Sequence, residues 1–171
     1  MGPARATEPL FGRQIDDVRM SIAASTKSDP ATIRVALQNV GHEQRLVDLG
    51  WLSDGTADPT HLELFVTWND GASISIAKPT MVPTRPDPAA IPLPPGGRCE
   101  FTLSLDKYQM FSGDRRIPVS KYLSGQCGDR CGIQVQLRVR TPYCRDAGSV
   151  TPEASGCWKG TLIANDLRFP Q

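Results

Sequence analysis

The sequence predicts an all-β fold, a two-sheet antiparallel sandwich of about seven or eight strands. Apolar residues alternate with polar ones along most of the chain, and this period of two is typical of strands that bury one face. Fifteen glycines and fifteen prolines divide the chain into short segments, which argues against long helices. The 171 residues suffice for a single domain, 1–171, with a core of its own. A closed barrel is the competing architecture, because the strand count fits both.

The first predicted strands show the alternation in its simplest form. Apolar residues alternate with polar or small ones over 18–22 and again over 33–37. The second run stops at the turn signal over 39–41, and a short apolar run follows over 46–49. Ahead of these strands, residues 1–14 are predicted to form a flexible arm.

A β-hairpin is predicted over 62–76. Residues 62–68, Leu-Glu-Leu-Phe-Val-Thr-Trp, are dense in bulky side chains, as expected of a central strand. Asn69-Asp70-Gly71 follows, and the alternation then resumes over 73–76. Because glycine tolerates the positive φ that such a turn requires, this pattern specifies a hairpin.

Prolines are concentrated in the next stretch, predicted as a Pro-rich loop over 79–97. Seven of the fifteen prolines lie between residues 79 and 95. Proline cannot donate a hydrogen bond to a ladder, so this stretch is a crossing loop or an extended edge segment. Phe101, Leu103 and Leu105 then alternate in a further strand.

A long loop is predicted over 106–131, and a loop of that length is either functional or partly helical. The most regular strand of the chain follows, with Ile133, Val135, Leu137 and Val139 facing inward. The last strand is predicted over 158–169, with a break at Asn165-Asp166.

Three stretches resemble the immunoglobulin-like accessory domains of bacterial and fungal secreted proteins. They are the strand and polar turn of 33–41, the Pro-Gly loop, strand and aromatic corner of 93–108, and the closing strand of 158–169. Such a domain precedes the catalytic part of the deuterolysin-like metalloproteases, and a protease-inhibitor sandwich of bacilli has similar strands. The resemblance covers about half the chain and implies an immunoglobulin-like sandwich. Residues 112–131 look like an insertion, and no protease zinc motif follows, so no functional residue is carried over.

Five cysteines indicate that the chain contains disulfide bonds, and the odd count leaves at least one cysteine without an intrachain partner. Cys144 follows one predicted strand and Cys157 precedes the next, so antiparallel pairing of these strands would bring the two together. We therefore predict a Cys144–Cys157 disulfide, and Cys99, Cys127 and Cys131 then share at most one more. Zinc is disfavoured because only Cys127 and Cys131 are close in sequence. Their spacing is also one residue too long for a redox Cys-x-x-Cys motif.

The sequence lacks a catalytic constellation. Of its two histidines, His42 and His61, neither belongs to a metalloprotease motif, and no serine lies in Gly-x-Ser-x-Gly. Both histidines are expected to be exposed loop residues. Gly96-Gly97 lacks the lysine of a phosphate loop, and the acidic residues are too scattered for a calcium loop. We predict that the protein is not an enzyme and uses no cofactor or metal ion.

The segment 106–130 is the predicted binding site, because basic residues alternate there with aromatic ones and long loops tend to carry binding. The candidate contact residues are Tyr108, Phe111, Arg115, Arg116, Lys121, Tyr122 and Arg130. A net charge of +1 and an aromatic content of 6% argue against a nucleic-acid partner, so a protein is expected. The alternative is that this segment only covers an open end of the sandwich.

No apolar run approaches the roughly 20 residues that span a bilayer. The start of the chain, Met1-Gly2-Pro3-Ala4-Arg5, has no apolar stretch of the kind found in signal peptides. Two locations stay open: cytoplasmic if the sequence is the complete reading frame, and extracytoplasmic if a leader ahead of Met1 was trimmed.

Together these features predict a non-catalytic interaction domain with its specificity in its loops. A protease inhibitor that presents an exposed loop is the alternative, and the Pro-rich stretch over 79–95 is the candidate for that loop. An enzyme of unfamiliar type is the third possibility.

Overall fold

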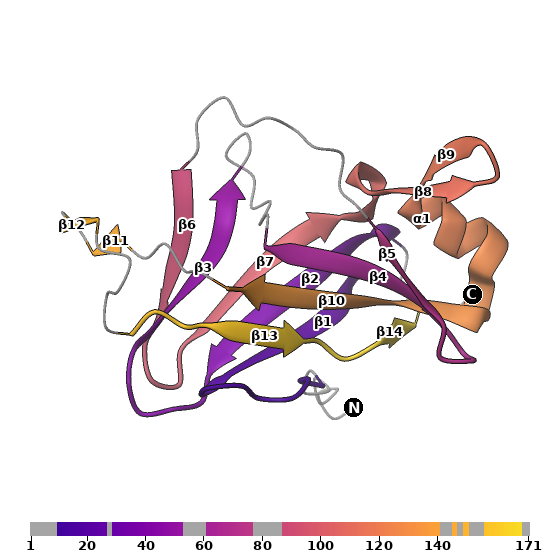
Figure 1. Ribbon diagram of the computed structural model, residues 1–171. Coiled ribbons are helices and arrows are strands. Elements are labelled where there is room, and N and C mark those ends of the chain that lie inside the picture. Colours follow the sequence, from indigo (N-terminus) through magenta and orange to yellow (C-terminus); the bar gives the residue numbers. More distant parts are fainter. Residues whose placement is uncertain are drawn as a thin grey trace.

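The all-β prediction is confirmed by the computed structural model, in which the chain is mostly β, with 60% strand and one short helix. The strands form several small antiparallel sheets (Figure 1). The structure describes residues 10–26, 29–52, 61–76, 87–140, 145–146, 149–150 and 156–168.

A three-stranded sheet is built from the first two predicted strands and the strand after the prolines. β1 (Val18–Thr26) pairs with β2 (Asp29–Asn39), and β2 pairs on its other side with β7 (Arg98–Ser104). The inward positions follow the predicted alternation, since Val35 of β2 lies opposite Ile22 and Phe101. The period of two therefore places one apolar face of this sheet toward the core.

A five-stranded sheet contains the predicted hairpin and the most regular strand. β4 (Leu62–Trp68) and β5 (Ser73–Ile76) form the hairpin as predicted, and Gly71 has a φ of +86° in its turn. β10 (Cys131–Val139) pairs with β4 and, on its other side, with β13 (Gly160–Ile163) and β14 (Leu167–Arg168). The predicted break in the last strand is confirmed, because residues 164–166 separate β13 from β14.

A two-stranded ribbon adjoins both of these sheets. β3 (Arg45–Leu52) pairs with β6 (Asp87–Leu93), and within the described residues β6 has no second ladder. β6 contacts β7, and β3 contacts β10. The end of the predicted Pro-rich loop is therefore the extended edge segment that its prolines allow. Residues 79–86 of that loop lie outside the described part of the chain.

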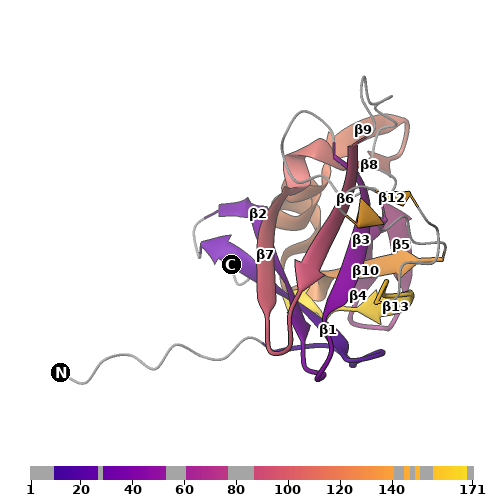
Figure 2. The ribbon, with the colours of Figure 1, turned by 90° about the vertical axis from the view of Figure 1, so that its left-hand side faces the viewer.

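One apolar core takes in side chains of both sheets. Figure 2 shows β2 and β7 on one side of the molecule and β4, β10 and β13 on the other. Val35 and Leu37 of β2 belong to the same buried cluster as Leu64 of β4 and Ile133 and Val135 of β10. Burial of such side chains contributes roughly 1.5–3 kcal/mol each, so this cluster is the main stabilising feature of the fold.

The expected long loop over 106–131 is instead an ordered unit, and we name residues 105–130 the end cap. Its elements are η1 (Leu105–Lys107), β8 (Gln109–Ser112), β9 (Arg115–Pro118), α1 (Val119–Tyr122), a π-helical turn η2 (Leu123–Cys127) and η3 (Gly128–Arg130). The alternative that such a segment is partly helical is confirmed. It is ordered because its apolar residues join the core, and α1 contacts β2 while η2 contacts β10.

Two further expectations are corrected by the described residues. The described strands number fourteen, more than the seven or eight predicted, because short ladders such as β8–β9 and β11 (Arg145–Asp146) with β12 (Ser149–Val150) add to the main sheets. Residues 10–14 of the expected flexible arm lie against β1, where the Gly12 N–H donates to the Met20 carbonyl at 2.8 Å. Residues 1–9 lie outside the described part of the chain.

Candidate functional site

The seven candidate contact residues occupy different environments in the end cap. Tyr108 is only 2% exposed and is a core residue, and Tyr122 is half-buried against the core. Phe111 is 69% exposed. The basic residues are all exposed: Arg115, Arg116, Lys121 and Arg130. The tyrosines are therefore anchors of the end cap, and Phe111 with the basic residues forms its outer surface.

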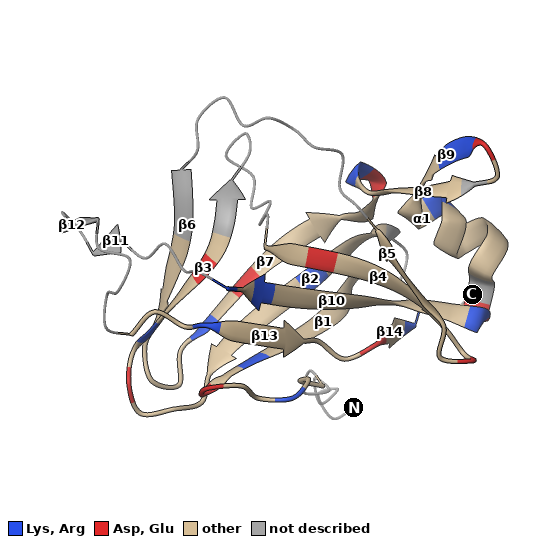
Figure 3. Ribbon diagram, in the orientation of Figure 1, with Lys and Arg blue, Asp and Glu red and all other residues tan. Residues whose placement is uncertain are grey.

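Three of the exposed residues meet at the tip of the β8–β9 hairpin. Phe111 lies directly opposite Arg116, and Ser112 lies opposite Arg115. The guanidinium carbon of Arg116 is 5.2 Å from the centroid of the Phe111 ring, within the range of a cation–π contact. Gly113, with a φ of +60°, closes the tight turn. In Figure 3, the basic positions of β9 lie next to an acidic position in the turn between β8 and β9. An aromatic ring flanked by arginines is thus presented to solvent.

The base of this hairpin is fixed to the body of the protein. The Val119 N–H donates to the Tyr108 carbonyl at 2.9 Å, and the Ser120 hydroxyl bonds the Asp106 carboxylate. Met110 and Val119 are buried in the core. The hairpin tip is therefore carried on a base with little freedom to move.

The buried hydroxyl of Tyr108 has no hydrogen-bond partner among the described residues. Burial disfavours the charged phenolate and raises the pKa of Tyr108 to about 12. Its ring is therefore used for packing, and its polar group plays no part in the surface of the end cap.

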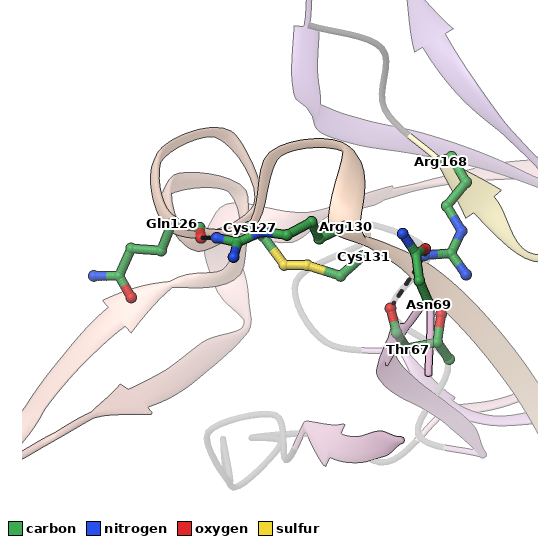
Figure 4. The surroundings of a disulfide bond; sticks show 7 residues. All are labelled: Thr67, Asn69, Gln126, Cys127, Arg130, Cys131 and Arg168. Atoms are coloured by element: carbon green, nitrogen blue, oxygen red, sulfur yellow. Dashed lines mark hydrogen bonds between the residues drawn. A yellow bond between two sulfur atoms is a disulfide. The ribbon is translucent and has the colours of Figure 1, made fainter. Parts of the chain in front are cut away.

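Cys127 and Cys131 come together where the end cap joins β10 (Figure 4). Their Cα atoms are 5.7 Å apart, within the range that a disulfide requires. Beside them, Arg130 donates to the Gln126 carbonyl at 3.1 Å, and the Asn69 N–H donates to the Arg130 carbonyl at 3.1 Å. These contacts fix the far end of the end cap to the β4–β5 turn.

A second group of charged residues, outside the predicted binding segment 106–130, lies at the other end of β10. Arg138, Arg140 and Lys159, together with Val139, Gly160 and Thr161, line a shallow pocket of about 510 Å³, named here the basic pocket. Figure 3 shows the corresponding Lys and Arg positions at the carboxyl end of β10 and just before β13. Lys159 is far from the two arginines in the sequence and comes close to them only through the pairing of β10 with β13.

The two histidines differ in their surroundings. His42 is exposed, as expected, in the turn after β2. His61 is only partly exposed, and its Nε2 lies 3.7 Å from a carboxylate oxygen of the buried Asp48 on β3. His61 lies in a turn as expected but is only half-exposed, because its N–H donates to the Leu49 carbonyl of β3 at 3.2 Å and holds it against that strand.

The strand pairing that the predicted Cys144–Cys157 disulfide requires is present. β10 and β13 are antiparallel, with Val139 opposite Gly160. Cys144 lies outside the described residues, so its bond to Cys157 stays a prediction. Cys99 is free, and its pKa is raised mainly by burial and further by the neighbouring Glu100.

Comparisons with protein families, with curated proteins and with solved structures find no match for this chain. In the described ranges, no three His, Cys, Asp or Glu side chains gather as they would around a metal ion. None of the helices described there has the length and apolar character to cross a membrane.

Proposed function

We propose that this protein is a non-catalytic interaction domain that binds a protein partner through the tip of the β8–β9 hairpin. The observation that carries the proposal is the exposure of Phe111 on a hairpin whose base is buried. Aromatic and arginine side chains are enriched among the residues that dominate protein interfaces. The complementary surface is an apolar pocket bordered by carboxylates, which would receive the Phe111 ring and pair with Arg115 and Arg116.

Preorganisation of the hairpin supports this role. A loop that must be ordered on binding loses part of the interaction energy to that ordering. Here the base is held by buried Met110 and by the bond between Val119 and Tyr108, and a disulfide between Cys127 and Cys131 would fix the far end. The conformational entropy lost on binding would then come from the partner and from the side chains at the hairpin tip.

The fold that we propose to carry this hairpin is an immunoglobulin-like two-sheet sandwich, not a closed barrel. In a closed barrel, β1 and β13 would be joined by a backbone ladder. Within the described residues β1 has no ladder with β13. The link is made instead by the side chain of Asn165, which bonds the backbone of Ile22. Two open sheets that share one core account for this arrangement.

The test is affinity capture with matched variants. Phe111→Ala removes the exposed ring at the hairpin tip. Ile74→Ala is the control, because Ile74 is also apolar and 53% exposed but lies on the edge strand β5. Both variants should melt like the parent, since neither side chain is part of the core.

We expect a protein captured by the parent and by Ile74→Ala to be lost with Phe111→Ala. The affinity of the captured protein for the domain should fall by a factor of ten or more when Phe111 is replaced, as is common for a central aromatic contact. Equal capture by all three proteins would show that the hairpin tip is not the binding surface.

A further inference from the structure

We propose that the basic pocket binds a doubly charged oxyanion, a phosphate or sulfate group carried by a small ligand. The pocket is lined by three cationic side chains: Arg138 of β10, Arg140 just after that strand and Lys159 just before β13. It lies at the carboxyl end of β10, whereas the end cap adjoins the start of that strand (Figure 1). This site is therefore separate from the hairpin tip and does not rest on the function proposed for it.

Strand pairing brings the three cations to one end of the β10–β13 ladder. Arg138 lies opposite Thr161, and Val139 lies opposite Gly160. Arg140 follows the last residue of β10, and Lys159 precedes the first residue of β13. Arg140 and Lys159 are exposed, and both line the pocket together with Arg138.

This arrangement is unfavourable without a counter-charge. Like charges that are held close together repel one another. Arg138 has a carboxylate partner in Glu63, at 3.6 Å. Among the residues whose side chains the structure describes, which leaves out 141–155, Arg140 and Lys159 have no ion-pair partner. A bound anion would offset the repulsion between them.

The balance of charge selects a dianion. Three cations face the pocket, and the Glu63 carboxylate neutralises one of them. The surplus of two positive charges matches a phosphate or sulfate group better than a single carboxylate. The two arginines lie roughly 7 Å apart along the strand, and their guanidinium groups can therefore reach oxygens of the same tetrahedral group.

The floor of the pocket is rigid. An added Cβ at Gly160 would lie 3.0 Å from a ring carbon of Trp158, so a side chain at this position would disturb the ring beneath it. The Trp158 indole N–H donates to the Ile15 carbonyl at 3.0 Å, which holds the ring in place. The basic side chains therefore extend from a fixed backbone, and the open pocket leaves room for the rest of a small ligand outside it.

The test is a titration of the ¹⁵N-labelled protein with inorganic phosphate, inorganic sulfate and acetate at constant pH and ionic strength, followed by NMR. The variant is Arg140→Gln with Lys159→Gln, and the matched control is Arg115→Gln with Arg116→Gln, which removes the same charge at the other end of the molecule. We expect saturable shifts of the amides over 138–140 and 159–161 with phosphate and sulfate, and none with acetate.

Binding of both dianions should weaken by about tenfold or more in the pocket variant and stay unchanged in the control. Glu63→Gln should strengthen binding, because it removes the competing carboxylate. Shifts that grow linearly without saturation, equal binding of acetate, or equal weakening in the two double variants would each overturn the proposal. Melting temperatures of all variants confirm that the domain is folded.

Discussion

Asn165 and Ile22 are 143 residues apart, and their polar groups form a closed pair. The Ile22 N–H donates to the Asn165 side-chain oxygen at 3.0 Å, and the Asn165 amide nitrogen donates to the Ile22 carbonyl at 3.3 Å. The side chain thus satisfies both backbone groups of Ile22 on the outer edge of β1. In a wider sheet, a neighbouring strand would form these two backbone hydrogen bonds instead.

Asn165→Ala is expected to destabilise the protein by about 1–3 kcal/mol, because it leaves the N–H and carbonyl of Ile22 without their partners. Asn165→Asp should also be destabilising, since its carboxylate can still accept from the Ile22 N–H but sets a second oxygen against the Ile22 carbonyl oxygen. Urea unfolding measures both. Equal stability of the alanine variant and the parent would show that water replaces the amide without cost.

Leu137→Asp is expected to cost roughly 3 kcal/mol or more, because it places an unpaired charge in the core. Leu137 is 0% exposed on β10, as the alternation of that strand predicted. Ile163→Asp on the adjacent β13 is the matched control, since Ile163 is 42% exposed. Chemical unfolding should separate the two variants clearly. A Leu137→Asp protein as stable as its control would mean that the strand faces the other way.

Leu123→Ala is expected to cost about 2–5 kcal/mol, because this side chain of the end cap is buried in the core. Lys121→Ala, two residues earlier and exposed, should change stability by less than about 0.5 kcal/mol. For the same reason, replacing 112–123 with a flexible linker should unfold the domain. Retention of a cooperative unfolding transition after that replacement would show that the end cap is only attached to the core.

The sequence predicted the sheets better than the end cap. Strands over 18–22, 33–37 and 133–139 were identifiable because alternation is a local property of the chain. The buried residues of the end cap change period within a few residues, from two apart at Tyr108 and Met110 to four apart at Val119, Leu123 and Cys127, since they come from short elements of different kinds. Their burial depends on contacts with β2 and β10, which no local pattern encodes.

The basic pocket was hidden for a related reason. Arg138 alternates with the inward-facing Leu137 and Val139, but a basic residue on the outward face of a strand is usually part of a solvated surface. Lys159 joins Arg138 only through the register of β10 with β13, and a segment of about twenty residues separates the two strands. The signal that could have revealed the pocket was the pairing of Val139 with Gly160, which brings the neighbouring Arg140 and Lys159 to the same end of the ladder and requires that register to be known.

Peptide mapping under non-reducing conditions should find Cys144 linked to Cys157. β10 ends before Cys144 and β13 begins after Cys157, and the antiparallel pairing of these two strands places Val139 opposite Gly160. In the chain-entropy model, a cross-link closing so short a loop stabilises by about 3 kcal/mol. Free thiols at both positions would rule this bond out. Recovery of Cys144 linked to Cys99 would replace it with a different bond.

The last prediction concerns stability at high pH. The pKa of Tyr108 is raised to about 12 in the folded protein by burial, whereas the usual value is 10. Because the pKa of Tyr108 is higher in the folded protein, unfolding releases a proton when the pH lies between 10 and about 12. The stabilising contribution is therefore complete below pH 10 and is lost progressively up to about pH 12, by about 1.4 kcal/mol per pH unit.

Tyr108→Phe should remove this loss, because phenylalanine has no group to ionise. At pH 7 the variant should be as stable as the parent or slightly more stable, since the buried hydroxyl has no hydrogen-bond partner in the described structure. Urea unfolding of both proteins at pH 8, 10 and 11 measures the difference, and Tyr122→Phe is the control for the half-buried ring. A loss of more than about 1 kcal/mol at pH 7 on removing the hydroxyl would show that it is hydrogen-bonded in solution. Parallel stability curves for parent and variant above pH 10 would show that the Tyr108 phenol ionises without a penalty from burial.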